Sequence, residues 1–134
     1  MRSYRLKEVA QLLGVSDDTV RRWADRGRFD TRTDGAGHRV VEGPELARFA
    51  QEIAATAESS SALDSTSARN RMTGLVTRVV RDTVMAQVEI QAGPYRLVSL
   101  MSREAADDLA LEPGVLAAAV VKSTNVVVET VDRL

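Results

Sequence analysis

The sequence of 134 residues contains no cysteine and a single histidine, His38. Without cysteine, disulfides and thiolate metal sites are excluded, and one histidine argues against a metal site built on imidazole. No stretch approaches the roughly 18 apolar residues of a membrane span, so we expect no membrane association. The first four residues show no signal peptide, and we therefore expect a cytoplasmic protein.

Features of common active sites are also missing. The chain has no cysteine nucleophile, no phosphate-cradling glycine loop and no pair of acidic residues in a recognisable acid–base frame. We therefore expect that the protein is not an enzyme and has no catalytic residues.

Charge of one sign does not dominate. The formal net charge is −1, which argues against a generally basic nucleic-acid coat. Residues 1–57 contain ten Arg or Lys against nine Asp or Glu, and the rest contains eight against ten. Because this asymmetry is slight, any contact with DNA must come from local clustering of basic side chains.

The periodicity of the apolar residues changes across a Ser-rich stretch, which predicts two small domains. We place them at residues 1–56 and 67–134, joined by a flexible linker at residues 57–66 that has no apolar stripe. Each domain is near the size at which a lone core is marginal, so self-association is expected.

The amino-terminal region predicts a helix, a tight turn and a second helix. Apolar residues at helical spacing form the first helix, which Gly14 stops, and Ser16 then caps a helix beginning at Asp17. We expect Val20 and Trp23 to face the core, with Trp23 as a packing residue; the alternative for Trp23 is a base-stacking residue. A hairpin follows within residues 29–41, turning at residues 34–37, and Pro44 opens a third helix.

This pattern resembles the winged helix-turn-helix of the MerR and excisionase-like regulators, over roughly residues 4–54. The motifs are residues 6–10, 14–16 and 19–23, with a wing ending at His38 and Arg39. The resemblance implies that Thr19, Arg21 and Arg22 enter the major groove of double-stranded DNA. It implies contacts of Arg32, His38 and Arg39 with the backbone or minor groove. The alternatives are a solvated arginine surface and, for His38, a plain turn position.

From Met72 onward the periodicity is that of strands. Two alternating runs separated by Arg81-Asp82, a strand over residues 95–101, a short helix capped by Ser102, and strands over residues 115–121 and 126–131 are expected. Five strands and one helix in this length predict a curled barrel of the oligonucleotide/oligosaccharide-binding type. The fold class is therefore α+β, in two domains.

Two polar clusters flank these strands, residues 67–74 at their beginning and residues 122–125 near their end. A tetrahedral dianion needs several donors converging on it, and amides, Ser hydroxyls and cationic side chains supply them. We interpret the two clusters as a site for a small oxyanion.

Residues 67–130 resemble the Mop (molbindin, TOBE-type) domain, which binds molybdate and tungstate. The resemblance is carried by residues 67–70 with Gly74, and by residues 101–106, 109–114 and 122–126. It implies that the anion is held by Ser67, Ala68, Arg69, Ser102, Lys122 and Ser123, at an interface between subunits. The chain departs from the family's common pattern in having Ser102 for Thr and Leu109-Ala110-Leu111 for Leu-Gly-Leu.

Together the two halves indicate a molybdate-responsive transcriptional regulator that acts as a homo-oligomer, either a dimer or a hexamer. Tungstate is an alternative ligand, and the sequence does not decide between the anions. One alternative function is an intracellular molybdate storage or buffering protein without regulatory DNA binding. Another is an excisionase-like architectural DNA protein whose barrel only drives assembly.

Overall fold

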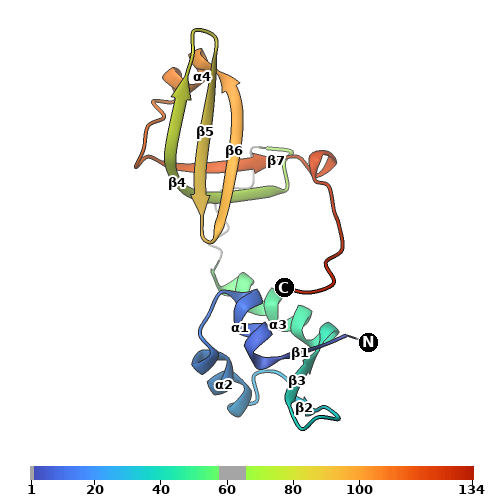
Figure 1. Ribbon diagram of the computed structural model, residues 1–134. Helices are drawn as coiled ribbons and strands as arrows, with labels where there is room; N and C mark the ends of the chain where they lie inside the picture. Colours follow the sequence, from blue (N-terminus) through green and yellow to red (C-terminus); the bar gives the residue numbers. More distant parts are fainter. Residues whose placement is uncertain (1, 58–65) are drawn as a thin grey trace. The chain divides into compact units, whose positions relative to one another are not determined.

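The computed structural model describes residues 2–57 and 66–134, which form two compact units (Figure 1). Residues 2–57 with 131–134 make up the first unit, and residues 66–130 make up the second. The predicted linker at residues 57–66 lies outside the described residues except at its two ends. The domain boundaries at residues 56 and 67 therefore stay a prediction.

The first unit consists of three helices and a small antiparallel sheet. Its elements in chain order are β1 (Ser3–Arg5), α1 (Leu6–Leu13), α2 (Asp17–Asp25), β2 (Arg32–Thr33), β3 (Arg39–Glu42) and α3 (Gly43–Ala57).

The predicted end of α1 and the predicted start of α2 are confirmed. Gly14 ends α1 with a backbone φ of 68°, in the left-handed region that glycine adopts without strain. Ser16 caps α2, since its Oγ accepts a hydrogen bond from the backbone N–H of Thr19 at 3.1 Å. These two residues fix the tight turn between the helices.

The core of the first unit joins α1, α2, α3 and β3. Val9, Val20, Val41 and Phe49 are fully buried, and each such side chain contributes about 1.5–3 kcal/mol through its burial. Trp23 packs edge-on against Phe49 with ring centroids 5.2 Å apart. The expected role of Trp23 as a packing residue is confirmed.

The predicted wing forms as a hairpin of β2 and β3. Thr33 pairs with Arg39 in an antiparallel register, and Asp34 N–H donates to the His38 carbonyl at 2.8 Å. The sequence analysis missed β1, a three-residue strand that pairs with β3 on its other edge.

The second unit is a curled antiparallel sheet with one short helix. Its elements are β4 (Asn70–Arg81), β5 (Met85–Ala92), β6 (Tyr95–Ser102), α4 (Arg103–Asp108), β7 (Leu116–Val121) and the 3-10 turn η1 (Ser123–Asn125). The strand order is β6-β5-β4-β7.

The long strand β4 carries the curl of this sheet. Its first half pairs with β7 and its second half with β5, and the exchange occurs at Leu75, which pairs with both Leu116 and Gln91. Figure 1 shows β7 crossing the direction of β5 and β6 as a result. A β-bulge between Val76 and Arg78 adds to the bend.

The bulge also corrects the predicted alternation along β4. Strict alternation would place Val80 on the same face as Val76, but the core takes Val76 and the partly buried Val79, while Val80 is 46% exposed. The extra residue in the bulge reverses which side chains face inward. Core residues contributed by the other elements of this unit are Ala86, Val88, Ile90, Ala106 and Leu111.

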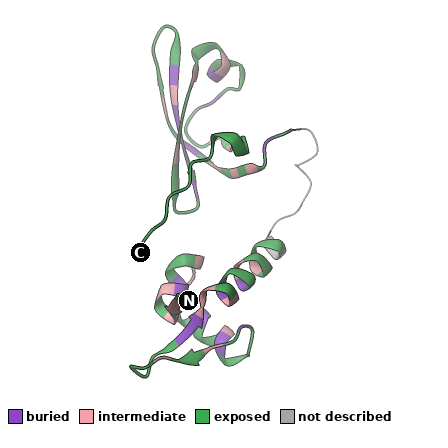
Figure 2. Cartoon of the chain, turned by 90° about the vertical axis from the view of Figure 1, so that its right-hand side faces the viewer, coloured by how far each residue is buried: buried purple, intermediate pink, exposed green. Residues whose placement is uncertain are grey.

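The predicted fifth strand over residues 126–131 is wrong for the single chain. These residues form no ladder with either edge of the sheet, because η1 turns the chain after β7 through a bond from Asn125 N–H to the Lys122 carbonyl. All residues from 122 to 134 are exposed, as the green ribbon in Figure 2 shows. Within the described residues, the sheet of the second unit therefore has four strands.

The short helix α4 begins and ends as its capping residues dictate. Ser102 Oγ accepts from Ala105 N–H at 3.1 Å, which confirms the predicted cap. At the other end, Leu111 N–H donates to the Ala106 carbonyl and Ala110 N–H to the Asp107 carbonyl, which is the Schellman arrangement. Ala110 occupies its left-handed position with φ 51°, where glycine is usual.

Candidate functional site

The two polar clusters predicted to bind an oxyanion lie at the same end of the β4–β7 ladder. Asn70, the first residue of β4, pairs with Val121, the last residue of β7. Its side-chain Nδ2 also donates to the Val121 carbonyl at 3.0 Å. Residues 67–69 immediately precede this pair and Lys122 and Ser123 immediately follow it, so the register brings the two clusters together.

Donors of several kinds are concentrated at this end of the sheet. Ser67, Arg69, Lys122 and Ser123 are exposed, whereas Ala68 is only 6% exposed. These five residues offer two hydroxyls and two cationic side chains, and none of them has a carboxylate. Such a set suits a small dianion, because charge-assisted hydrogen bonds to oxyanions are the strong ones.

Some of these donors already have partners within the segment. Ala68 N–H donates to Thr66 Oγ1 at 3.2 Å, and Arg69 Nη1 donates to the Ser67 carbonyl at 3.4 Å. These local bonds hold residues 66–69 in a turn beside the start of β4.

Ser102 lies elsewhere in the unit. It pairs with Met85 where β5 begins, beyond the opposite end of β4 from Asn70. A single chain therefore does not bring Ser102 to the other five predicted anion ligands.

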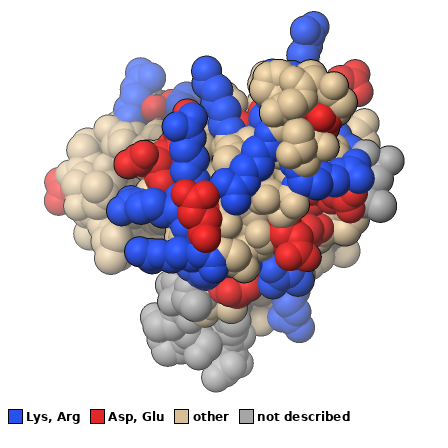
Figure 3. Space-filling view, turned by 90° about the horizontal axis from the view of Figure 1, so that it is seen from below, with Lys and Arg blue, Asp and Glu red and all other residues tan. Residues whose placement is uncertain are grey.

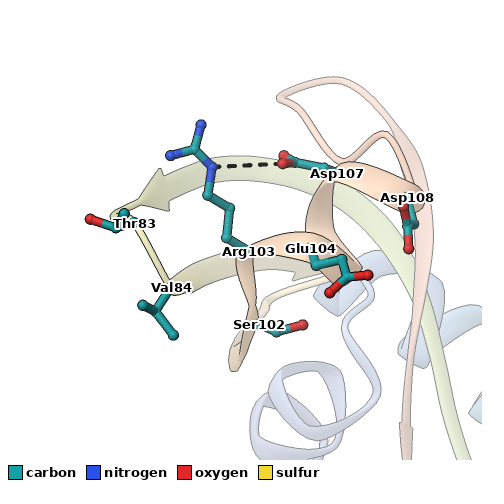
Figure 4. Close-up of a pocket in the computed structure, with 7 residues that line it drawn as sticks. All are labelled: Thr83, Val84, Ser102, Arg103, Glu104, Asp107 and Asp108. Carbon is teal, nitrogen blue, oxygen red and sulfur yellow. Dashed lines mark ion pairs between the residues drawn. The ribbon is translucent and has the colours of Figure 1, made fainter.

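The surroundings of Ser102 differ in charge from the β4–β7 end. Ser102 lines a pocket of about 550 Å³ together with Thr83, Val84, Arg103, Glu104, Asp107 and Asp108 (Figure 4). Arg103 is the one cation among these residues, and its Nε lies 3.6 Å from Asp107 Oδ2. Three carboxylates against one guanidinium make this pocket unsuited to a dianion in the isolated chain.

The residues predicted to enter the DNA groove lie on α2. Arg21 and Arg22 are exposed on this helix. Thr19 has a structural role too, since its Oγ1 contacts Ser16 Oγ at 2.9 Å and accepts from Arg22 Nη2 at 3.4 Å. The α2 surface thus presents two guanidiniums, and that of Arg22 donates to Thr19.

The predicted wing residues are each matched with a carboxylate. Arg32 Nη1 lies 2.9 Å from Glu42, Arg39 Nη1 lies 2.7 Å from Asp25, and His38 Nδ1 lies 3.7 Å from Asp34. These pairs are solvent-exposed, so each contributes little to stability and mainly orients the side chains.

The wing turn begins with an acidic residue. Asp34 Oδ1 accepts the backbone N–H groups of His38 at 2.8 Å and Ala36 at 2.9 Å. The N–H of His38, more than any other group, lowers the pKa of Asp34 below its usual value. The carboxylate thereby fixes the turn that presents His38 and Arg39.

The sequence analysis missed one residue that organises the oxyanion candidate. Asn70 belongs to the polar cluster but was not assigned as a site residue, and its amide joins the beginning of β4 to the end of β7. An amide side chain in the polar cluster just before the predicted strands was the available signal.

The described residues contain no group of three or more His, Asp or Glu side chains placed to hold a metal ion. In the same residues, no helix is both long and apolar enough to cross a membrane.

Comparison with known proteins matches each half of the chain to a domain family. The model of the TOBE domain matches residues 66–128, and the model of a helix-turn-helix domain matches residues 3–53. Molybdenum-pterin-binding protein 3 from Clostridium pasteurianum is 37% identical over 65 residues, which are 48% of this chain and 96% of that protein.

Two solved structures resemble the second half. A molybdate binding protein from Sporomusa ovata is 31% identical, with 50% of this chain and all of that chain covered and a TM-score of 0.48. MopII from Clostridium pasteurianum is 34% identical, with 49% of this chain and all of that chain covered and a TM-score of 0.46. From the domain matches and the curated relative, the chain belongs to the TOBE (Mop) family in its carboxy-terminal half and carries an excisionase-like helix-turn-helix domain in its amino-terminal half.

Proposed function

We propose that this protein is a molybdate-responsive, DNA-binding transcriptional regulator. In this account the TOBE half binds molybdate and the helix-turn-helix half binds double-stranded DNA. Molybdate bound to the TOBE half changes the affinity of the helix-turn-helix half for DNA. The chain joins both kinds of domain. A relative that matches the TOBE half over 96% of its own length is named for binding molybdenum-pterin.

The observation that carries the proposal is the bond from Asn70 Nδ2 to the Val121 carbonyl. It holds the segment containing Ser67, Ala68 and Arg69 next to Lys122 and Ser123. Hydroxyls, cations and backbone amides are thus gathered at one end of the sheet, without a carboxylate to repel a dianion.

We further propose that a second copy completes the site. The donors at the β4–β7 end are exposed in one chain, while Ser102 is at the far end of the unit. An apolar outer surface supports self-association, since Leu75 and Leu116 lie directly opposite each other and are 51% and 72% exposed. The expected assembly is a homo-oligomer, a dimer or a hexamer.

Coupling to DNA then follows from a population shift. An anion bound between copies favours the arrangement of the oligomer in which its ligands converge, and that arrangement sets the spacing of the DNA-binding halves. Thr19, Arg21 and Arg22 on α2, with Arg32, His38 and Arg39 on the wing, are the proposed DNA contacts. Tungstate, a second tetrahedral dianion, is proposed to bind the same site, and no catalytic role is proposed.

Calorimetric titration of the full chain with sodium molybdate tests the anion half. We expect saturable binding that Lys122→Ala weakens by about tenfold or more, since a hydrogen bond to a charged group is worth about 1.5–3 kcal/mol. Arg78→Ala removes the same charge from the second half of β4 and should leave the affinity unchanged. Absence of heat with either molybdate or tungstate would refute the proposal.

Titration of duplex DNA with the same protein tests the other half. Binding at physiological salt that changes on addition of molybdate supports a regulator. A chain that binds molybdate and ignores duplex DNA would instead be a storage or buffering protein. A chain that binds DNA without any response to molybdate would be an architectural protein.

A further inference from the structure

A second concentration of positive charge lies in the helix-turn-helix unit, in a cleft of about 360 Å³ lined by Arg5, Leu6, Lys7, Arg21, Asp25, His38 and Arg39. Three parts of the unit meet there: the junction of β1 and α1, the exposed side of α2 and the wing just after its turn. The pairing of Arg5 with Val40 through β1 and β3 sets the beginning of α1 beside the wing.

The cleft has a clear excess of positive charge. Arg5, Lys7, Arg21 and Arg39 are cationic, and Asp25 is the single carboxylate of the lining. Asp25 is matched with Arg39, whose Nε also donates to Thr31 Oγ1 at 3.1 Å. A second carboxylate, Asp34, lies close enough to Arg5 for a weak attraction, although the backbone N–H of His38 is the main cause of its lowered pKa.

Three of the cations of the cleft differ from several other basic residues of this unit. Within residues 2–57, no ion pair involves Arg5, Lys7 or Arg21, whereas Arg28, Arg32 and Arg48 each lie within 3.4 Å of a glutamate oxygen. Figure 3 shows one face of the molecule on which Lys and Arg side chains crowd between scattered acidic ones. Charges without an internal partner are available to an external polyanion.

We propose that this cleft holds backbone phosphates of duplex DNA and that Arg5 and Lys7 contact them directly. The inference rests on the proposed DNA-binding function and adds two contact residues outside α2 and the wing. Arg21 connects the cleft to the groove-facing surface of α2. Arg39, which contacts Asp25 and Thr31, contributes a further cation from the wing.

The geometry favours a DNA backbone over a small phosphate ligand. The cations come from different walls of an open cleft, and none of the lining residues is buried. An extended polyanion contacts such separated charges one phosphate at a time, and each contact releases counterions. α1 and α2 would then both touch the duplex, which fixes how far α2 enters the groove.

The test is the salt dependence of DNA binding by the full chain, measured by fluorescence polarisation with a labelled 30-base-pair duplex of mixed sequence. Losing one phosphate contact reduces the slope of log K against log salt by about 0.9 and weakens binding about eightfold at 0.1 M salt. We expect this for Arg5→Ala and for Lys7→Ala, with about twice the change in the double variant. Lys7→Arg keeps the charge and should keep the slope, and Arg78→Ala is the control for bulk charge.

The variants should keep the fold, because Glu8 accepts the backbone N–H of Arg5 rather than its side chain. Circular dichroism checks this. Unchanged slopes in both alanine variants, with the wild type binding normally, would overturn the inference and leave the proposed function intact. Displacement of DNA by millimolar inorganic phosphate, beyond the effect of equal ionic strength, would also overturn it and indicate a small-anion site. No DNA binding by the wild type would refute the proposed function itself.

Discussion

Gly74→Ala should unfold or strongly weaken the TOBE unit while leaving the helix-turn-helix unit in place. A Cβ at Gly74 would stand 2.2 Å from the Gln91 carbonyl oxygen, 2.7 Å from its carbon and 2.9 Å from Ala92 Cα. All three are backbone atoms, so no side chain can rotate to make room. β4 exchanges partners at the next residue, where β5 and β7 both approach it.

The loss of stability caused by Gly74→Ala can be estimated from how far β4 and β5 must separate. Ordinary contact requires β4 and β5 to separate by about 1 Å, against a normal strand spacing of about 4.8 Å, and that stretches the ladder bonds near Gln91. Overpacking of this kind costs about 1–3 kcal/mol, and each lost hydrogen bond adds about 1 kcal/mol. We expect a loss of about 3 kcal/mol, which lowers the urea midpoint by about 3 M for a slope of about 1 kcal/mol/M.

Urea unfolding of the full chain at fixed protein concentration measures this loss. Trp23 is the single tryptophan and belongs to the first unit, so its fluorescence follows that unit, while far-ultraviolet circular dichroism also follows the sheet of the second. Gly35→Ala meets open space in the first unit and should be near neutral. Gly93→Ala also meets open space but has φ 56°, and its cost should be about 1 kcal/mol. A Gly74→Ala loss no larger than that of Gly93→Ala would refute the reasoning.

Two further predictions concern backbone geometry and pH. Ala110→Gly should stabilise the TOBE unit by about 0.5–1 kcal/mol in the same urea assay, because glycine relieves the left-handed strain at φ 51° but gains entropy when unfolded; a destabilised variant would contradict this. Asp34 and Asp82 should titrate below 3.8 in a carbon-13 NMR experiment, since each carboxylate accepts two backbone N–H groups. Because folding lowers these pKa values, the turns are stabilised above pH 3.8 and lose that contribution as the pH falls through the lower folded values. Titration of either group at or above 3.8 would count against the turn geometry.

The sequence predicted the first unit well because local signals decide its elements. Gly14, Ser16 and Pro44 each act on the residues beside them, and the helical spacing of the apolar residues determines the core faces. β1 escaped prediction because a three-residue strand has no periodicity of its own and forms only by pairing with β3.

In the second unit the errors arise from contacts distant in sequence. The bulge in β4 depends on how β5 is aligned, so Val80 could not be assigned to the outer face from alternation alone. The segment over residues 126–131 has strand composition, yet a strand needs a neighbouring edge, and η1 turns the chain away from the sheet. Composition could not show this.

The candidate site was predictable in part for the same reason. Two polar clusters at the ends of predicted strands suggested a meeting point, and the β4–β7 register brings them together. The separation of Ser102 from them depends on the course of all four strands, which no local pattern contains. The cationic cleft of the first unit likewise depends on β1, the element that was missed.

A crystal structure of the full chain grown with sodium molybdate tests the central claim most directly, through the anomalous signal of molybdenum. The account predicts a peak beside Ser67, Arg69 and Lys122 of one copy, at the end of β4 and β7 where Asn70 donates to the Val121 carbonyl. It also predicts that a neighbouring copy covers this end of the sheet. A peak elsewhere on the molecule, or none at saturating molybdate, would contradict the account.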